Sequence, residues 1–273
     1  MGIFKIWLLI LYLMVSVDDL RVFGREVRAR LGLRTYPIGI KFCTEPCDLS
    51  GFKRPRDFGV HMAVCQVINI SRVYGWPMAF TLDDMFCIGG AYLFGLVPEY
   101  PKFLEESPDW HTSSADAKKY IQQKYLERAL PQGSTKAVLV APLEKITFMP
   151  DVIDIYGTPT QISAIAKALI WYGIFPETGF IGLSSCSFIT NAHKTRKPQI
   201  NLPSSGEVAW GRTEEDEISI IIPVEHVDKI LSGLDGISRI YPYPVPKFAF
   251  YEPRPPRGYK ITYKDYEEWK KHT

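Results

Sequence analysis

Short runs of β-branched and apolar residues alternate along this chain with stretches of helical periodicity. The runs at 36–42 (YPIGIKF), 151–156 (DVIDIY) and 217–222 (EISIII) have the length and composition of strands. Between such runs, apolar residues recur at the spacing of one helix face, as they do at positions 20, 23, 27 and 31 of residues 18–31. A chain built this way is expected to form a mixed α/β (α+β) fold.

Local signals predict further elements. Ser113 or Ser114 can cap a helix over 115–130, and Thr158-Pro159 begins a helix that runs to Tyr172. Further helices are predicted at 59–74, 83–94, 223–231 and 263–271, a short strand at 137–140, and loops at 43–58 and 97–112. The glycine-rich stretch after Tyr172, which contains Cys186, is expected to be a connection.

The two halves of the chain repeat one pattern. Each half reads as a strand, a helix bearing a glutamine, a Tyr-Gly pair, and a cysteine twelve or thirteen positions after that glycine. These residues are Gln66, Gly75 and Cys87 in the first half, and Gln161, Gly173 and Cys186 in the second. Chance matches of such short patterns are the alternative explanation. Duplicated halves would pack about a pseudo-two-fold axis and bring the two cysteines to equivalent places at a junction, where clefts commonly form.

This pattern divides the chain into four parts. They are an apolar N-terminal segment (1–17), a first half-repeat (18–135), a second half-repeat (136–246) and a proline-rich tail with a short C-terminal helix (247–273). The two pseudo-repeated strand-helix halves are expected to pack into one globular unit.

Composition disfavours several classes of protein. Apolar residues make up 46% and charged residues 23% of the chain, as in ordinary globular domains, so a disordered or fibrous chain is not expected. The 32 basic and 30 acidic residues are interspersed, which argues against a nucleic-acid partner. Five scattered cysteines do not form the framework of a small secreted protein, so a reducing cytoplasm is the expected location.

Residues 6–17 (IWLLILYLMVSV) are the one segment that argues for export. Twelve apolar residues are too few to span a bilayer, which takes about 20, and Asp18 and Asp19 stand where a signal would need small residues. We therefore expect no membrane partner. The segment is either a surplus start upstream of Met14 or an apolar helix that docks on the body or on a second copy, forming a homo-oligomer. Residues 1–13 are expected to be dispensable for the fold.

Several segments, taken in order, resemble the ArCR family of archaea and bacteria, a domain of unknown function. They are CQVINISRVYG from Cys65, DDMFCIGGAYLFGL from Asp83, APLEKITFMPDVIDIYGTPTQI from Ala141, SSCS from Ser184 and GRTEEDEISIIIP from Gly211, all within residues 33–246. The resemblance implies no activity, because none is established for the family. It does imply that the cysteines at 65, 87 and 186 follow the family pattern, whereas Cys43 and Cys47 lie outside it.

Cys65, Cys87 and Cys186 form the strongest candidate constellation. Each is flanked by small or polar residues that would let a bulky centre approach the backbone. Three thiolates can hold a soft transition metal or an iron–sulfur cluster and leave one position for a fourth ligand or a substrate. Sulfurs that share one centre should lie within about 7 Å of each other. The alternative is that each cysteine packs as a small hydrophobe, and the absence of C-x-x-C spacing keeps that alternative open.

A small-molecule binding or sensing module without catalysis is the second hypothesis. Its cleft would be lined by Gln66, Arg72, Tyr74, Gln161, Tyr172 and Arg212. An arginine beside a cleft can clamp a carboxylate or phosphate through two hydrogen bonds, although such charges usually form a solvated face. Arg212 is the better candidate of the two arginines, because it follows an apolar stretch and precedes a strand.

Other chemistry finds less support. The sequence has no G-x-x-x-x-G-K-[ST], G-x-G-x-x-G, G-x-S-x-G or H-E-x-x-H motif, and whether the chain is an enzyme stays open. Cys43 and Cys47 could form half a metal site or a loop disulfide. His61 lies one turn before Cys65 and could share a metal with it, and His193 invites a cysteine–histidine nucleophile with Cys186. A solvated histidine is commoner than a ligand, and a nucleophile also needs a third orienting group.

Overall fold

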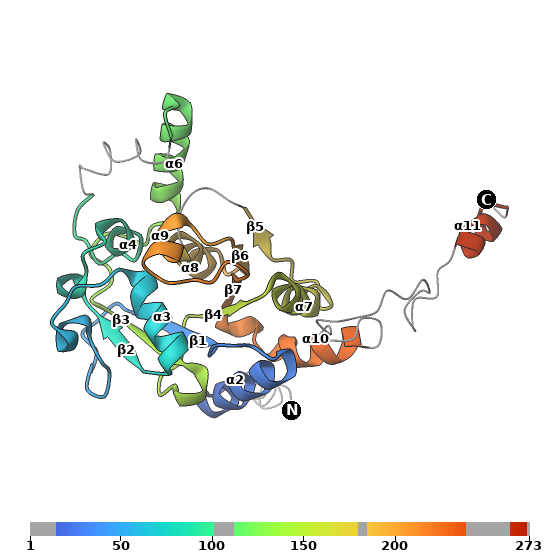
Figure 1. The fold of residues 1–273 in the computed structure, drawn as a ribbon, viewed down its shortest axis with the longest axis horizontal. Helices are drawn as coiled ribbons and strands as arrows, with labels where there is room; N and C mark the ends of the chain where they lie inside the picture. Colours follow the sequence, from blue (N-terminus) through green and yellow to red (C-terminus); the bar gives the residue numbers. More distant parts are fainter. Residues whose placement is uncertain (1–14, 101–111, 180–184, 239–262, 272–273) are drawn as a thin grey trace, which may run out of the picture.

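A computed structural model describes residues 15–100, 112–179, 185–238 and 263–271 of the chain. Its strands form a seven-stranded sheet with helices on both faces, which confirms the predicted mixed α/β class (Figure 1). The strands are β1 (Ile38–Cys43), β2 (Met78–Phe80), β3 (Ala137–Pro142), β4 (Val152–Gly157), β5 (Glu177–Thr178), β6 (Gln199–Asn201) and β7 (Ile218–Pro223). The α-helices are α2 (Val17–Leu31), α3 (Val64–Tyr74), α4 (Ile88–Leu93), α6 (Ala115–Arg128), α7 (Pro159–Ile170), α8 (Ser185–Thr195), α9 (Ser205–Ala209), α10 (Asp228–Ser238) and α11 (Tyr263–Lys270). Short 3-10 helices lie at η1 (Pro55–Phe58), η2 (Leu82–Asp84), η4 (Leu143–Lys145) and η5 (Val224–His226).

The strand order is β2-β3-β1-β4-β7-β6-β5, with β1 and β4 adjacent near the middle. Neighbouring strands run antiparallel, except β5 and β6, which are parallel. Ile38 of β1 stands opposite Pro142 of β3 and Asp154 of β4. Because residues directly opposite each other share a face of the sheet, Asp154 points to the same face as Ile38.

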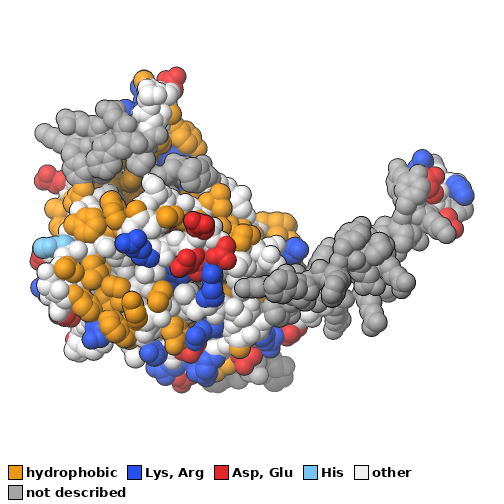
Figure 2. Space-filling view, viewed as in Figure 1, with side chains coloured by type: hydrophobic (Ala, Val, Ile, Leu, Met, Phe, Trp, Pro, Cys, Tyr) orange, Lys and Arg blue, Asp and Glu red, His pale blue; other side chains and the backbone are white. Residues whose placement is uncertain are grey.

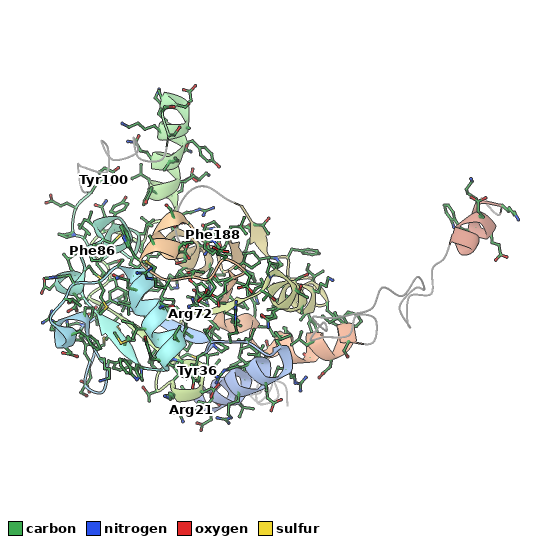
Figure 3. The ribbon with its side chains drawn as sticks, in the orientation of Figure 1. Arg21, Tyr36, Arg72, Phe86, Tyr100 and Phe188 are labelled. Atoms are coloured by element: carbon green, nitrogen blue, oxygen red, sulfur yellow. The ribbon has the colours of Figure 1, made fainter. Side chains whose placement is uncertain are left out.

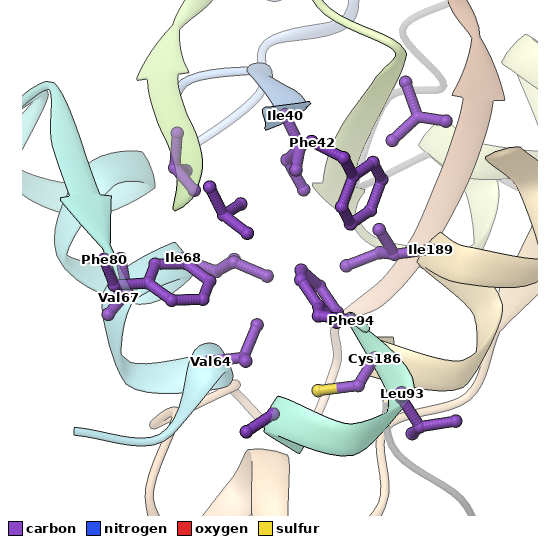
Figure 4. Close-up of a cluster of buried hydrophobic side chains, with 14 of the residues drawn as sticks. Ile40, Phe42, Val64, Val67, Ile68, Phe80, Leu93, Phe94, Cys186 and Ile189 are labelled. Atoms are coloured by element: carbon purple, nitrogen blue, oxygen red, sulfur yellow. The ribbon is translucent and has the colours of Figure 1, made fainter. Parts of the chain in front are cut away.

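Two apolar cores lie on opposite faces of this sheet. On one face, Ile40 of β1 packs in a cluster with Ile68 of α3 and Ile189 of α8, as Figure 4 shows. On the other face, side chains that include Ile153 and Ile222 pack with α2, α7 and α10. Burial of both faces explains why the central strands are almost continuously apolar in sequence.

The helices α2 and α7 begin with the caps that the sequence predicts, although α7 ends at Ile170 and not at Tyr172. The Ser16 hydroxyl accepts a hydrogen bond from the backbone N of Asp19 at 3.1 Å, and Gly32 ends α2 in the left-handed conformation with φ of 64°. At α7, the Thr158 hydroxyl accepts from the backbone N of Gln161 at 3.4 Å, and Pro159 occupies the first turn.

Three predicted helix boundaries are wrong. The helix predicted at 59–74 begins only at Val64, because η1 occupies the preceding residues and Gly59 ends that turn with φ of 69°. Residues 83–94 divide into η2 and the shorter α4. The helix predicted at 223–231 consists of η5 followed by α10, which extends to Ser238.

The connection expected after Tyr172 is also wrong, because that stretch contains α8, β6 and α9. The buried residues of α8 include Ser185, Cys186, Ser187 and Thr190 beside Phe188 and Ile189. Small and polar side chains on a buried helix face obscure the apolar periodicity by which such a helix is normally detected. Cys186 therefore lies on a helix and not in a loop.

The internal repeat is not confirmed. The strands do match across the β1–β4 boundary, because β3 flanks β1 and β7 flanks β4, and both flanking strands end in a proline followed by a 3-10 turn. However, α3 packs on one face of the sheet and α7 on the other. A two-fold rotation that exchanges β1 with β4 leaves each face of the sheet on its own side. Such a rotation therefore cannot superpose α3 on α7.

Some predictions lie outside the described residues. They are those for residues 1–13, for most of the 97–112 loop, and for the extended proline-rich tail; the short helix that follows the tail is present as α11. Among the described helices, none has the length and apolar composition needed to cross a bilayer.

Candidate functional site

The thiols of Cys87 and Cys186 border one small space beside Gly90 of α4. A methyl group added to Gly90 would lie 3.5 Å from Cys186 Sγ and 3.6 Å from Cys87 Sγ. The two sulfurs therefore cannot be further apart than the sum of these distances. Cys87 is the N-cap residue of α4 and Cys186 is the second residue of α8, so two helix starts bring the two thiols together.

Cys65 lies on the neighbouring helix, directly after Val64. The Val64 side chain is a third neighbour of the same space, since its Cγ2 would lie 3.2 Å from a methyl group on Gly90. The Cys65 thiol contacts the carbonyl oxygen of Gly206 at 3.8 Å. Burial, together with the nearby Cys87, raises the pKa of Cys65 to about 12, and burial also raises the pKa of Cys87. These thiols are therefore protonated at neutral pH.

Tyr125 of α6 is a neighbour of Cys87 and Cys186. Burial and these two thiols raise the pKa of the Tyr125 hydroxyl. Among the residues that the structure describes, no three His, Cys, Asp or Glu side chains are grouped so that they could hold a metal ion. The shared metal centre thus stays a prediction.

Glu207 and Asp154 belong to a buried network of polar side chains that reaches the start of α8, beside Cys186. The carboxylate of Glu207 on α9 is fully buried and accepts hydrogen bonds from the backbone N of Ser185 at 2.9 Å and of Ser204 at 3.0 Å. The side chain of Asn201 donates to it at 3.0 Å. Burial raises the pKa of Glu207, while these hydrogen bonds act in the opposite direction. The network holds the start of α8, and therefore Cys186, in place.

Asp154 of β4 is the second acid of this network. It is fully buried, and burial, with the nearby negative charge of Glu207, raises its pKa to about 8. The side chain of Ser219 acts in the opposite direction and lowers the pKa of Asp154. Within the described part of the chain, neither carboxyl oxygen of Asp154 has a partner at hydrogen-bond distance and angle. Sequence reasoning missed both acids. The available signal was a lone acidic residue inside the apolar strand VIDIYG.

Arg72 is held inside the protein and does not line an open cleft. Its two terminal nitrogens donate to the two carboxylate oxygens of Glu217, both at 3.0 Å, and both side chains are only 2% exposed. The guanidinium lies 4.2 Å from the ring centroid of Tyr156. Figure 3 labels Arg72 close to the centre of the molecule, where α3 passes the sheet.

Gln66 and Gln161 both bond the N-cap residues of their helices. The side-chain oxygen of Gln66 accepts from the backbone N of Ala63 at 2.8 Å, and that of Gln161 accepts from the backbone N of Thr158 at the same distance. Thr158 completes a capping box through its hydroxyl, whereas Ala63 has no side chain that can accept a hydrogen bond. Their matching positions in the sequence thus reflect the same capping role. Arg212 lies on the surface with a left-handed φ of 52°.

The two tyrosines expected beside a cleft are also on the surface. Tyr74 is 61% exposed and stacks on Trp76 at 5.3 Å between ring centroids, and Phe58 stacks on the same Trp76 at 6.1 Å. Figure 2 shows exposed apolar side chains gathered on this face of the molecule. Tyr172 is exposed on the second half and bonds Ser232.

The remaining cysteines and histidines lie apart from the cluster. Cys43 and Cys47 form no disulfide; burial and the hydrogen bond that the Cys43 thiol donates to Cys47 raise the pKa of Cys43 to about 12. His61 is exposed, whereas Cys65 is buried. The ring centroids of His193 and Phe42 are 4.9 Å apart. His193 lies two turns after Cys186 on α8, which separates the two residues by about 10 Å along the helix at 1.5 Å per residue. That spacing excludes direct contact between the imidazole and the thiol.

Comparison with known proteins places this site in a recognised but uncharacterised group. The model of the family described as uncharacterised ArCR matches residues 26–233, which include Cys65, Cys87, Cys186 and both buried acids. An uncharacterized protein of Methanocaldococcus jannaschii is 25% identical over 183 residues, which is 65% of this chain and 78% of the relative. No solved structure matches the chain.

Proposed function

The chain belongs to the uncharacterised ArCR family, and we propose that it is a metal-binding protein in which Cys65, Cys87 and Cys186 hold a soft transition metal or an iron–sulfur cluster. The observation that carries this proposal is the closeness of the Cys87 and Cys186 sulfurs, which would both contact one methyl group placed on Gly90. Thiolate ligands favour soft metals and iron–sulfur clusters.

The third ligand requires a local change. Cys65 lies beside the same space through its neighbour Val64, but its sulfur contacts the carbonyl of Gly206. Cys87 is near enough to act electrostatically on the Cys65 thiol. The proposal requires the Cys65 side chain to leave the Gly206 carbonyl and turn toward the other two thiols.

Protonation sets the condition for uptake. Burial raises the pKa of both Cys65 and Cys87, and a metal must displace the thiol protons in order to bind. Metal affinity is therefore expected to increase as the pH rises from 6 to 8. Burial has the further effect of shielding a bound centre from water.

The experiment is anaerobic reconstitution of the full chain with zinc, or with iron and sulfide, followed by measurement of bound metal. Cys65→Ala, Cys87→Ala and Cys186→Ala are each expected to lose most of the uptake. Cys43→Ala and Cys47→Ala are matched controls, because they also remove one free thiol, and should keep it. Equal uptake by all five variants, or none by the unaltered protein, would leave packing as the role of the three cysteines.

A further inference from the structure

A basic pocket of about 540 Å³ lies between η1, η2 and the segment that enters β3, and none of Cys65, Cys87 and Cys186 lines it. Arg54, Arg56 and Lys136 supply its positive charges, and Leu96 contributes to an apolar wall. This volume lies in the range of small-molecule sites, which combine apolar walls with a few convergent polar groups.

The two arginines are held in place by one buried carboxylate. Asp84 is fully buried; Arg54 donates to one of its oxygens from Nε at 3.1 Å, and Arg56 donates to the other from Nε at 2.8 Å. Burial alone would raise the pKa of Asp84, but the hydrogen bonds from Arg56 and Arg54 hold it below its usual range. Asp84 is therefore charged at neutral pH and orients both guanidiniums before any ligand arrives.

Hydrogen-bond donors remain unused in this pocket. Its three cationic side chains face three acids, Asp57, Asp83 and Asp84, so the charges are balanced before a ligand binds. In the described contacts, Arg56 bonds Asp84 through Nε, so its two terminal amino groups are left for a ligand.

Thr135 supplies an independent observation. Its side chain lines the pocket and the residue is 3% exposed, yet its hydroxyl has no hydrogen-bond partner among the residues described. A buried hydroxyl without a partner destabilises the protein unless a ligand or water satisfies it. The Thr135 oxygen is itself out of contact with solvent, so a bound oxyanion would accept this hydrogen bond only after the Thr135 side chain rotates.

From these observations we infer that the pocket binds a small molecule through an oxyanion, either a phosphate or a carboxylate. The terminal nitrogens of Arg56 and the hydroxyl of Thr135 would donate to the oxyanion, and Lys136 would add charge. The apolar part of the ligand would lie against the wall that includes Leu96. The site is separate from the cysteine cluster and does not depend on a metal there.

The test is calorimetric titration of the full chain with inorganic phosphate and, separately, with succinate, each against chloride at equal ionic strength. Saturable binding of either anion is expected, and the arm that binds more tightly identifies the oxyanion. Arg56→Gln and Thr135→Val should each weaken binding by about tenfold or more, because each removes hydrogen-bond donors to the charged oxyanion.

Arg196→Gln is the matched control. Arg196 has the same side-chain exposure as Arg56, 49%, and also pairs with a carboxylate, that of Glu225. Its replacement should leave binding unchanged. Should Arg56→Gln fail to fold by circular dichroism, Thr135→Val decides, because it removes one hydroxyl and no charge. Absence of saturable binding of both anions, or an equal loss in the Arg196 control, would overturn the inference.

Discussion

The carboxyl groups of Asp154 and Glu207 share one buried network, and the charge of Glu207 contributes, after burial itself, to raising the pKa of Asp154 to about 8. Glu207 is held by backbone N–H groups at the starts of α8 and α9, whereas neither oxygen of Asp154 has a full hydrogen bond in the described structure. The two acids therefore differ in how they are stabilised, and Asp154 carries its proton at neutral pH.

The protonation of Asp154 predicts how the stability of the protein depends on pH. Its pKa rises on folding from 3.8 to about 8, so stability is greatest below the unfolded value and falls as the pH rises toward 8, by at most about 1.4 kcal/mol per pH unit. Asp154→Asn removes this term. Urea unfolding at pH 5, 7 and 9 should show the variant becoming more stable than the unaltered protein as the pH rises. Asp235→Asn, on the surface, is the control, and parallel pH profiles for all three proteins would refute the prediction.

The buried pair of Arg72 and Glu217 predicts a large loss of stability when one partner is removed. Glu217→Gln leaves the guanidinium buried without a counter-ion, which typically costs about 3–5 kcal/mol. Glu225→Gln breaks an exposed arginine pair and should cost less than about 1 kcal/mol. Free energies of unfolding from urea titration check both values, and similar losses in the two variants would contradict the buried pairing.

The contact between α7 and α10 depends on Gly233. A methyl group there would lie 2.3 Å from the carbonyl oxygen of Ala168 on α7, a contact that only movement of the helices can relieve. Gly233→Ala is expected to lower the melting temperature by several degrees, although alanine favours helices by about 1 kcal/mol. Ser238→Ala, at an exposed position of α10 whose hydroxyl bonds the Asp235 carbonyl within the same helix, should show no such loss. A melting temperature for Gly233→Ala at or above that of the unaltered protein would show that the helices are further apart.

The parts of the fold that sequence reasoning predicted are those with strong local signals. Strand β4 and helix α7 carry β-branched residues, a threonine cap and a proline in the first turn. Helix α8 was missed because serine, cysteine and threonine form much of its buried face. Its packing depends on α4 and the sheet, which are distant in sequence.

The candidate site was predicted only in part. The cysteines could be selected by residue type. The pairing of Arg72 with Glu217 could not be predicted, because it joins residues 145 positions apart and no local pattern indicates it. Gln66 and Gln161 were selected as a matched pair, and the shared feature proved to be a hydrogen bond from the N-cap backbone N to the glutamine side chain. A repeated residue can thus reflect a repeated helix start instead of a repeated binding site.

The proposed centre is tested most directly by X-ray absorption at the metal edge of the full chain, reconstituted without oxygen with zinc. The account predicts three sulfur neighbours at about 2.3 Å, decreasing to two in Cys65→Ala and unchanged in Cys47→Ala. A first shell made only of oxygen and nitrogen, or a sulfur count that does not decrease in Cys65→Ala, would contradict a metal held by Cys65, Cys87 and Cys186.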